Sequence, residues 1–204
     1  TQIIFKFEDQ EGLLTLIAKN EQGYRNMIEL SSKSYLENDN LSKPHCKLID
    51  LFDKNKGLIV MSGTINGLIG NLFNKGKFEL IEDIYKKLKN YYSDNFYIEI
   101  QRHSDKDEKS FEKFNLNLSL KHNIPIIASH EVFYIEKNMH DAHEALICIG
   151  NKSYLNDKTR KSYTSEHYLK SHLEMEKIFE DLPEALENNY NLPFRCSFRP
   201  TPSD

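Results

Sequence analysis

Apolar and polar residues alternate at the start of the chain in the pattern of two β-strands. The stretches QIIFKF (2–7) and LLTLIA (13–18) are separated by a polar turn from Glu8 to Gly12. Asn20 can cap a helix from Glu21 to about Leu36, because an Asn side chain accepts a hydrogen bond from the first helical turn. We expect the buried side of this helix to include Met27, Ile28, Leu30 and Tyr35.

The middle of the chain repeats a strand-then-helix pattern. Residues 37–46 are polar and contain Pro44, which predicts a loop before this pattern begins. Such an alternation indicates βαβ units and a parallel sheet, either open or closed into a barrel. The predicted strands are 57–63, 96–101 and 124–129, and the predicted helices are 77–92, 106–122 and 139–149.

Functional groups in α/β proteins gather beyond the carboxyl ends of the strands. Glu99, Gln101 and His103 share one face of their strand, and a polar face on a central strand is costly unless it lines a site. His103, His130 and Glu131 could converge there as zinc or manganese ligands. The alternative is a solvated rim, where the same side chains face water.

Other polar motifs are weaker signals. His140 and His143 share a helix face, but an H-x-x-H pair without H-E-x-x-H favours an ordinary polar helix start. MSGTINGLIG (61–70) lacks both phosphate-loop fingerprints and predicts a turn into a short helix. The segments 102–110 and 156–168 read as solvated loops, and Lys158, Arg160 and Lys161 form too small a basic cluster to indicate nucleic-acid binding.

Composition narrows the class of protein. The 204 residues are 39% hydrophobic and 28% charged with a net charge of −4, as in a folded domain without a nucleic-acid-coating surface. Three separated cysteines, Cys46, Cys148 and Cys196, predict reduced thiols and a cytoplasmic protein. No apolar run approaches the roughly 20 residues of a membrane helix. Because Thr1 abuts an apolar strand pattern, we expect the natural start to lie upstream.

Five collinear segments of the chain match the motifs of one known family. LLTLIAKNEQGYRNMIELSSKSY resembles that family's HLTLLAKNxxGYxNL, GLIVMSG its GLIxLSG, and FYIEIQRHSDKDE its YLEIQxHGxPxE. IPIIASHEVFYIEKNMHDAHEALICIG resembles LPLVATNDVHYxxxxDxxAHDxLxCIxxG, and YLKSHLEMEKIFEDLPEALEN resembles YLKSxEEMxxLFxDxPEALxNT. Together these segments resemble the PHP domain of the bacterial DNA polymerase III alpha (catalytic) subunit. The resemblance covers residues 1–198, and it makes 199–204 the start of a linker towards the palm domain.

The resemblance implies an α/β fold, a distorted (β/α)7 PHP barrel with a trinuclear metal centre at its mouth. The barrel is incomplete here, since the family's opening H-x-H strand and T-D-H motif precede Thr1. Family ligands fall on Gln2, Leu13 and Phe133, which have lost metal-binding groups. His103 keeps a ligand type, Glu131 replaces an aspartate and His130 an asparagine, so these three are vestigial candidates and no bound metal is expected.

The resemblance also implies three alternative functions. The first is a degenerate PHP domain within a replicative DNA-directed DNA polymerase, a nucleotidyltransferase, where it serves as structural and partner-binding platform. The second is an active metal-dependent phosphoesterase or proofreading exonuclease. The third, polymerase activity of this chain itself, is disfavoured because the palm and its catalytic Mg²⁺ lie downstream. Expected partners are the rest of the polymerase, the proofreading exonuclease subunit and other replisome subunits, with DNA bound only through the whole enzyme.

The missing opening strands predict an open edge. The strands 2–7 and 13–18 would lose neighbours, so Ile3, Phe5, Leu14 and Leu16 would be partly uncovered. This segment would then be stable only with its upstream strands or after pairing with another chain.

Overall fold

The chain begins with a β-hairpin that turns at Glu8 and Asp9. We analysed a computed structural model, in which residues 1–38 and 43–200 are described. The strands are β1 (Gln2–Phe7), β2 (Gln10–Ala18), β3 (Cys46–Lys47), β4 (Leu58–Met61), β5 (Phe96–Ile100) and β6 (Ile126–Ala128). The helices are α1 (Glu21–Leu36), α2 (Leu48–Asp53), α3 (Leu68–Asn74), α4 (Phe78–Tyr92), α5 (Glu108–His122), α6 (His140–Asn151), α7 (His172–Ile178) and α8 (Pro183–Asn191), with 3-10 turns at Ser93–Asn95, Lys137–Met139 and Pro193–Arg195.

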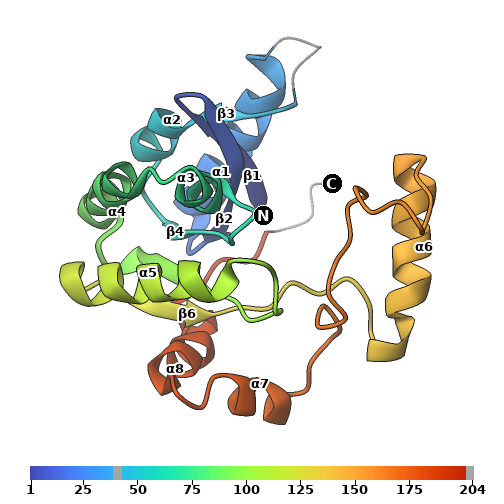
Figure 1. Ribbon diagram of the computed structural model, residues 1–204. Helices are drawn as coiled ribbons and strands as arrows, with labels where there is room; N and C mark the ends of the chain where they lie inside the picture. Colours follow the sequence, from blue (N-terminus) through green and yellow to red (C-terminus); the bar gives the residue numbers. More distant parts are fainter. Residues whose placement is uncertain (39–42, 201–204) are drawn as a thin grey trace.

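The described strands form one six-stranded mixed sheet in the order β3-β1-β2-β4-β5-β6. β4, β5 and β6 are parallel, as the βαβ pattern predicts, whereas β2 runs antiparallel to both of its neighbours. The α/β class is therefore confirmed, but the ladder that is described is open and a closed (β/α)7 barrel is not part of it. α1, α2 and α3 pack against the hairpin, α4 contacts β4 and β5, and α5 contacts β5, while Figure 1 shows α8 beneath β6.

The element boundaries follow local chemistry. The Asn20 side chain accepts from the Gly23 amide and starts α1 at Glu21, as predicted. Leu30 is buried and Met27 half-buried in α1, but Ile28 and Tyr35 are exposed, because they lie on another side of the helix. The predicted loop 37–46 ends in β3, and its residues 39–42 lie outside the described residues.

The prediction that the apolar residues of the hairpin are partly uncovered is wrong. Ile3, Phe5, Leu14 and Leu16 are all buried, because α1, α2 and α3 pack against β1 and β2. β2 lies between β1 and β4, and β3 pairs with β1 at Phe5 and Lys6. The opposite edge, β6, is covered by α8: the Asn188 side chain donates to the Ile126 carbonyl at 2.8 Å and that of Asn189 to the Ala128 carbonyl. Amide side chains thus satisfy carbonyls that a neighbouring strand would otherwise bind.

The three cysteines are free thiols, as expected. No helix within residues 1–38 and 43–200 is both long and apolar enough to cross a membrane.

Candidate functional site

Loops beyond the carboxyl ends of β5 and β6 meet a third loop at what we call the mouth, residues 101–107, 129–134 and 160–168. The third loop joins α6 to α7 and is held by backbone hydrogen bonds, from Phe133 N to the His167 carbonyl and from Leu169 N to the Tyr134 carbonyl, both 2.9 Å. A parallel bridge between Tyr134 and Tyr168 completes this contact. The short pairing brings His167 beside residues far away in the sequence.

Three imidazoles stack at the mouth. His103 lies between His130, whose ring centroid is 4.5 Å away, and His167, whose centroid is 4.1 Å away with the rings 4° from parallel. His103 and His167 are each only 1% exposed. Stacked rings direct their in-plane lone pairs side by side, so the three histidines cannot all converge on one ion.

One hydrogen bond and one nearby carboxylate surround the His103 ring. Its Nε2 accepts from the Glu131 amide at 3.1 Å, and its Nδ1 lies 3.4 Å from a Glu108 carboxylate oxygen. That carboxylate also accepts from the His103 amide. The Glu131 amide therefore occupies the Nε2 lone pair of His103, while Nδ1 faces a carboxylate at ion-pair distance.

His130 is held as a neutral donor. Its Nε2 lies 2.8 Å from the Tyr168 carbonyl, an acceptor, so this nitrogen carries the proton. Burial lowers the pKa of His130 to about 4, and the hydrogen bond only partly opposes that effect. A neutral ring avoids placing a charge against the face of His103.

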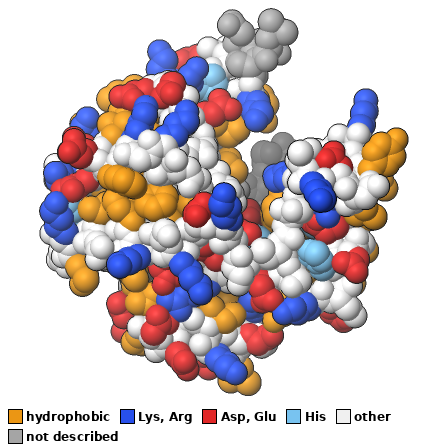
Figure 2. All heavy atoms as spheres, in the orientation of Figure 1, with side chains coloured by type: hydrophobic (Ala, Val, Ile, Leu, Met, Phe, Trp, Pro, Cys, Tyr) orange, Lys and Arg blue, Asp and Glu red, His pale blue; other side chains and the backbone are white. Residues whose placement is uncertain are grey.

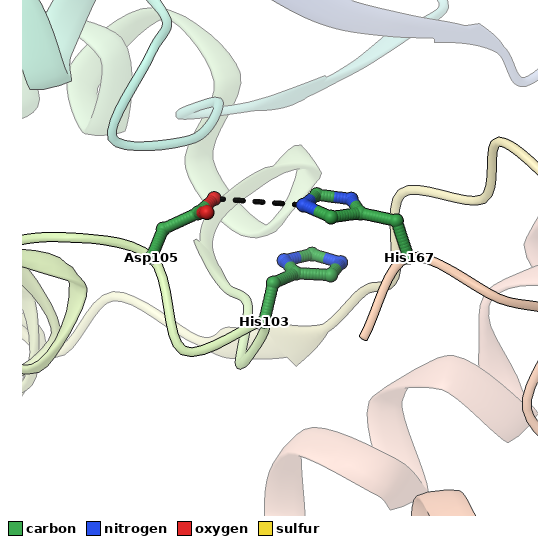
Figure 3. Close-up of side chains that lie close together, drawn as sticks. All are labelled: His103, Asp105 and His167. Carbon is green, nitrogen blue, oxygen red and sulfur yellow. Dashed lines mark ion pairs between the residues drawn. The ribbon is translucent and has the colours of Figure 1, made fainter. Parts of the chain in front are cut away.

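His167 differs from the other two rings. Its Nδ1 donates to the Glu131 carbonyl at 3.2 Å, while its Nε2 has no hydrogen-bond partner among the described residues. Nε2 points towards Asp105, whose Oδ2 lies 3.7 Å away, as Figure 3 shows. The nearby imidazole is the main cause that holds the pKa of Asp105 below its usual range.

A cavity of about 730 Å³ opens beside this stack. Its walls include Gln2, Leu13, Asp105 and Glu131, so residues from β1, β2 and two mouth loops share one space. Three cationic side chains also border it: Lys106, Arg160 and Lys161. Arg160 is bound to the buried Glu144 carboxylate, and the Lys161 ammonium lies 4.9 Å from the Tyr163 ring centroid.

Comparison with known proteins identifies the family. Residues 2–103 match the PHP domain. The DNA polymerase III subunit alpha of Caulobacter vibrioides is 35% identical over 185 residues, which are 91% of this chain and 16% of that protein. Those of Rickettsia bellii and Vibrio cholerae are 37% and 35% identical over 185 and 193 residues, or 91% and 94% of this chain.

The chain belongs to the PHP domain family. It spans about one sixth of the length of these alpha subunits, 16–17%. The matched residues end at His103, within the first mouth loop and before Asp105, His130 and His167.

A trinuclear PHP metal centre does not fit this mouth. The Gln2 amide lies 3.4 Å from the Thr15 hydroxyl, and Leu13 presents an isobutyl group to the cavity. Phe133 packs its ring against His167, His143 and Tyr163 at centroid distances of 4.9, 5.2 and 4.5 Å. An apolar wall and three bordering cations replace donors that divalent ions require.

The sequence-predicted residues meet, but not as a ligand set. His103, His130 and Glu131 do lie together, joined by a ring stack and by a hydrogen bond to the Glu131 amide. Sequence reasoning missed Asp105 and His167, because both fall in segments that were interpreted as solvated loops. The H-x-D spacing from His103 to Asp105 was the one available signal; nothing in the sequence indicated His167.

The other residues that the sequence analysis considered for a site make contacts within the fold. Glu99 is buried with one carboxylate oxygen bound to Gln101 and Ser129, and burial raises its pKa. On α6, His140 Nε2 lies 2.9 Å from the Tyr163 carbonyl, and His143 stacks on Phe133. MSGTINGLIG forms a turn into the short helix α3, as predicted.

Proposed function

We propose that this chain is the PHP region of the alpha subunit of a bacterial replicative DNA polymerase and acts there as a structural, partner-binding platform. The homology to alpha subunits over 91% of the chain supports the first part. In this proposal the whole cytoplasmic enzyme transfers nucleotides with Mg²⁺ in a palm domain outside this segment. DNA would be reached only through that whole enzyme.

The platform proposal rests on which side chains occupy the mouth. Gln2 and Leu13 line the cavity where the resemblance implies metal ligands, and Phe133 fills the third such position with a packed aromatic ring. Since a hydrolytic PHP centre needs several ions to activate water and to neutralise a phosphodiester, these replacements favour a role without hydrolysis.

The phosphoesterase alternative rests on one observation. Ligand atoms of His103, Asp105 and His167 all lie within 4.8 Å of one another. The Glu131 amide argues against a shared ion, because it occupies the Nε2 lone pair of His103.

Hydrolysis assays separate the two functions. We expect no release of nitrophenol from bis-(p-nitrophenyl) phosphate and no shortening of labelled single-stranded DNA above buffer with Mg²⁺, Mn²⁺ or Zn²⁺. Turnover by the natural chain that disappears in His103→Ala and Asp105→Asn would establish the alternative instead. Primer extension by the chain is also expected to equal the buffer control.

The platform needs a docking surface, and α6 supplies the best candidate. Leu146 and Ile149 are 64% and 76% exposed, and a groove of about 620 Å³ beside them is lined by Cys148, Tyr154 and Leu155. Figure 1 shows α6 standing apart from the helices around the sheet, and Figure 2 shows apolar side chains at its outer side. Exposed apolar groups of this kind are typical of protein interfaces.

We propose the proofreading exonuclease subunit of the same organism as the occupant of this surface. The double variant Leu146→Glu/Ile149→Glu should weaken its binding, measured by biolayer interferometry. Leu120→Glu on α5, at a side chain 84% exposed, is the matched control and should bind like the natural chain. Equal binding by all three proteins would remove α6 from the proposal.

A further inference from the structure

Polar side chains lie inside the protein between the sheet and α5. Two of them are almost fully buried: Glu99 on β5 is 6% exposed and Asn115 on α5 is 0% exposed. Each has one polar atom without a hydrogen-bond partner among the described residues, Oε2 of Glu99 and Nδ2 of Asn115. A buried acceptor or donor that has lost water and gained no other partner destabilises a fold, so both atoms need a partner.

The remaining polar atoms of these two side chains are already bonded. The Tyr85 hydroxyl donates to Asn115 Oδ1 at 2.9 Å, which leaves the amide nitrogen as the unused donor. Glu99 Oε1 accepts from Gln101 Nε2 at 3.0 Å and also from the Ser129 hydroxyl. Because these bonds fix the orientation of both side chains, one acceptor and one donor are left over.

Both side chains belong to the wall of one small cavity. It has a volume of about 10 Å³ and is bordered by β5, α5 and the turn before α3. One water molecule needs a cavity of about 10–15 Å³ and at least two polar partners, so the size and the leftover groups both suit a single water. Two further carboxylates border the cavity, but Glu108 accepts from the His103 amide and Glu112 binds the Arg102 guanidinium.

We propose that one water molecule occupies this cavity as a permanent part of the fold and bridges Asn115 Nδ2 to Glu99 Oε2. A water suits either state of the carboxyl group, because it donates to a carboxylate oxygen and accepts from a carboxylic acid proton. A cation suits the cavity less well, because the N–H of Asn115 would repel it. Burial raises the pKa of Glu99, which also disfavours the charged carboxylate that a cation would require.

The bridging water joins α5 to the base of the mouth. Asn115 holds it from α5, and Glu99 holds it from β5 while its other carboxyl oxygen binds Gln101 and Ser129. Gln101 and Ser129 are the first residues of two mouth loops. This water site goes beyond the proposed function and does not depend on it, because it lies beneath the mouth and takes no part in binding a partner.

The test combines a high-resolution crystal structure of the 204-residue chain with oxygen-17 magnetic relaxation dispersion, which counts long-lived internal water molecules. We expect one ordered water within about 3.2 Å of both Asn115 Nδ2 and Glu99 Oε2. Asn115→Leu has a side chain of similar size without a donor, and it should lower the number of long-lived waters by one. Glu99→Gln keeps a polar group beside the water and should leave that number unchanged.

The matched control is Asn26→Leu, at another buried asparagine, whose Nδ2 already donates to the Lys54 and Lys56 carbonyls. It should leave the number of long-lived waters unchanged although it also removes hydrogen bonds. Equal numbers in Asn115→Leu and the natural chain, or no electron density between the two atoms, would overturn the proposal. Density with contacts near about 2.4 Å to the Glu99 carboxylate would overturn it too, because that distance identifies a cation. If either leucine variant does not fold by circular dichroism, the crystal structure decides alone.

Discussion

The sheet with its surrounding helices and the mouth are held together by different forces. Phe5, Leu14 and Leu58 are fully buried in one continuous apolar cluster that reaches from β1 to α8. The mouth instead consists of stacked imidazoles, partly exposed rings and backbone hydrogen bonds between loops. A polar replacement inside the apolar cluster would lower the free energy of unfolding strongly, whereas side chains of a loop site can change with little loss of stability. The difference explains how a PHP domain can keep its architecture while its metal-binding groups change.

Arg102 lies where these two regions meet. Its guanidinium bonds the Glu112 carboxylate on α5 at 2.6 and 3.0 Å and the Asp181 carboxylate after α7 at 2.6 and 2.9 Å. It also lies over the Phe179 ring, 4.9 Å from the centroid. Arg102 belongs to the first mouth loop, but its side chain clamps α5 to the segment after α7 and does not line the cavity.

A substitution in the sheet should cause the largest loss in the free energy of unfolding. Phe5→Ala removes a fully buried ring and should lower the free energy of unfolding by about 3–5 kcal/mol, measured by urea denaturation. Leu120→Ala, at an 84% exposed side chain, should stay within about 0.5 kcal/mol. If Phe5→Ala does not fold, Phe5→Leu should still lose more than this control. A negligible effect of either Phe5 variant would break the comparison.

A smaller loss is expected at the clamp. Arg102→Lys keeps the charge but cannot bond two carboxylates through a planar fork, so unfolding free energy should fall by about 1–3 kcal/mol. Arg25→Lys tests the exposed Arg25–Glu21 pair and should change stability by less than about 0.5 kcal/mol. Both variants are compared with the natural chain in urea, and equal losses would mean that the fork geometry of Arg102 contributes nothing.

At the mouth we expect a loss below that of the sheet. Phe133→Ala deletes a ring that stacks on His167 and His143 but is 36% exposed, so the cost should be about 1–2 kcal/mol. Near-ultraviolet circular dichroism should change while far-ultraviolet dichroism persists, since the sheet does not depend on this ring. A loss as large as that of Phe5→Ala would show that the mouth is part of the core.

The smallest effect concerns thiol reactivity and leaves stability unchanged. Burial raises the pKa of Cys46 to about 11, so little reactive thiolate forms at pH 8. Cys196, which is only half-buried, should react first with iodoacetamide, and Cys46 last. The rate at Cys46 should keep rising with pH towards 11 because deprotonation creates the nucleophile. Peptide mass spectrometry after brief exposure to iodoacetamide measures the order in which the cysteines are alkylated. Equal rates at Cys46 and Cys196 at pH 8 would contradict the prediction.

Local patterns predicted most of the fold. The hairpin, α1 with its Asn20 cap, and the parallel strands β4 to β6 with α4 and α5 between them all correspond to periodicities that are visible in the chain. The short elements β3 and α2 were missed, since two- and six-residue stretches carry too little periodicity. The exposure of the apolar residues of the hairpin was predicted wrongly, because their coverage by α1, α2 and α3 depends on contacts between segments that no local pattern records.

The amino-acid sequence by itself determined which side chains are available for chemistry. It has Gln2, Leu13 and Phe133 at positions where ligands would be expected, and its apolar alternation builds the sheet. Only the tertiary structure decided which polar groups meet. Asp105 and His167 are 62 positions apart, and a backbone pairing of residues 133–134 with 167–169 brings them together. Chain periodicity encodes burial along one element, whereas a site depends on distances between elements, which no local pattern records.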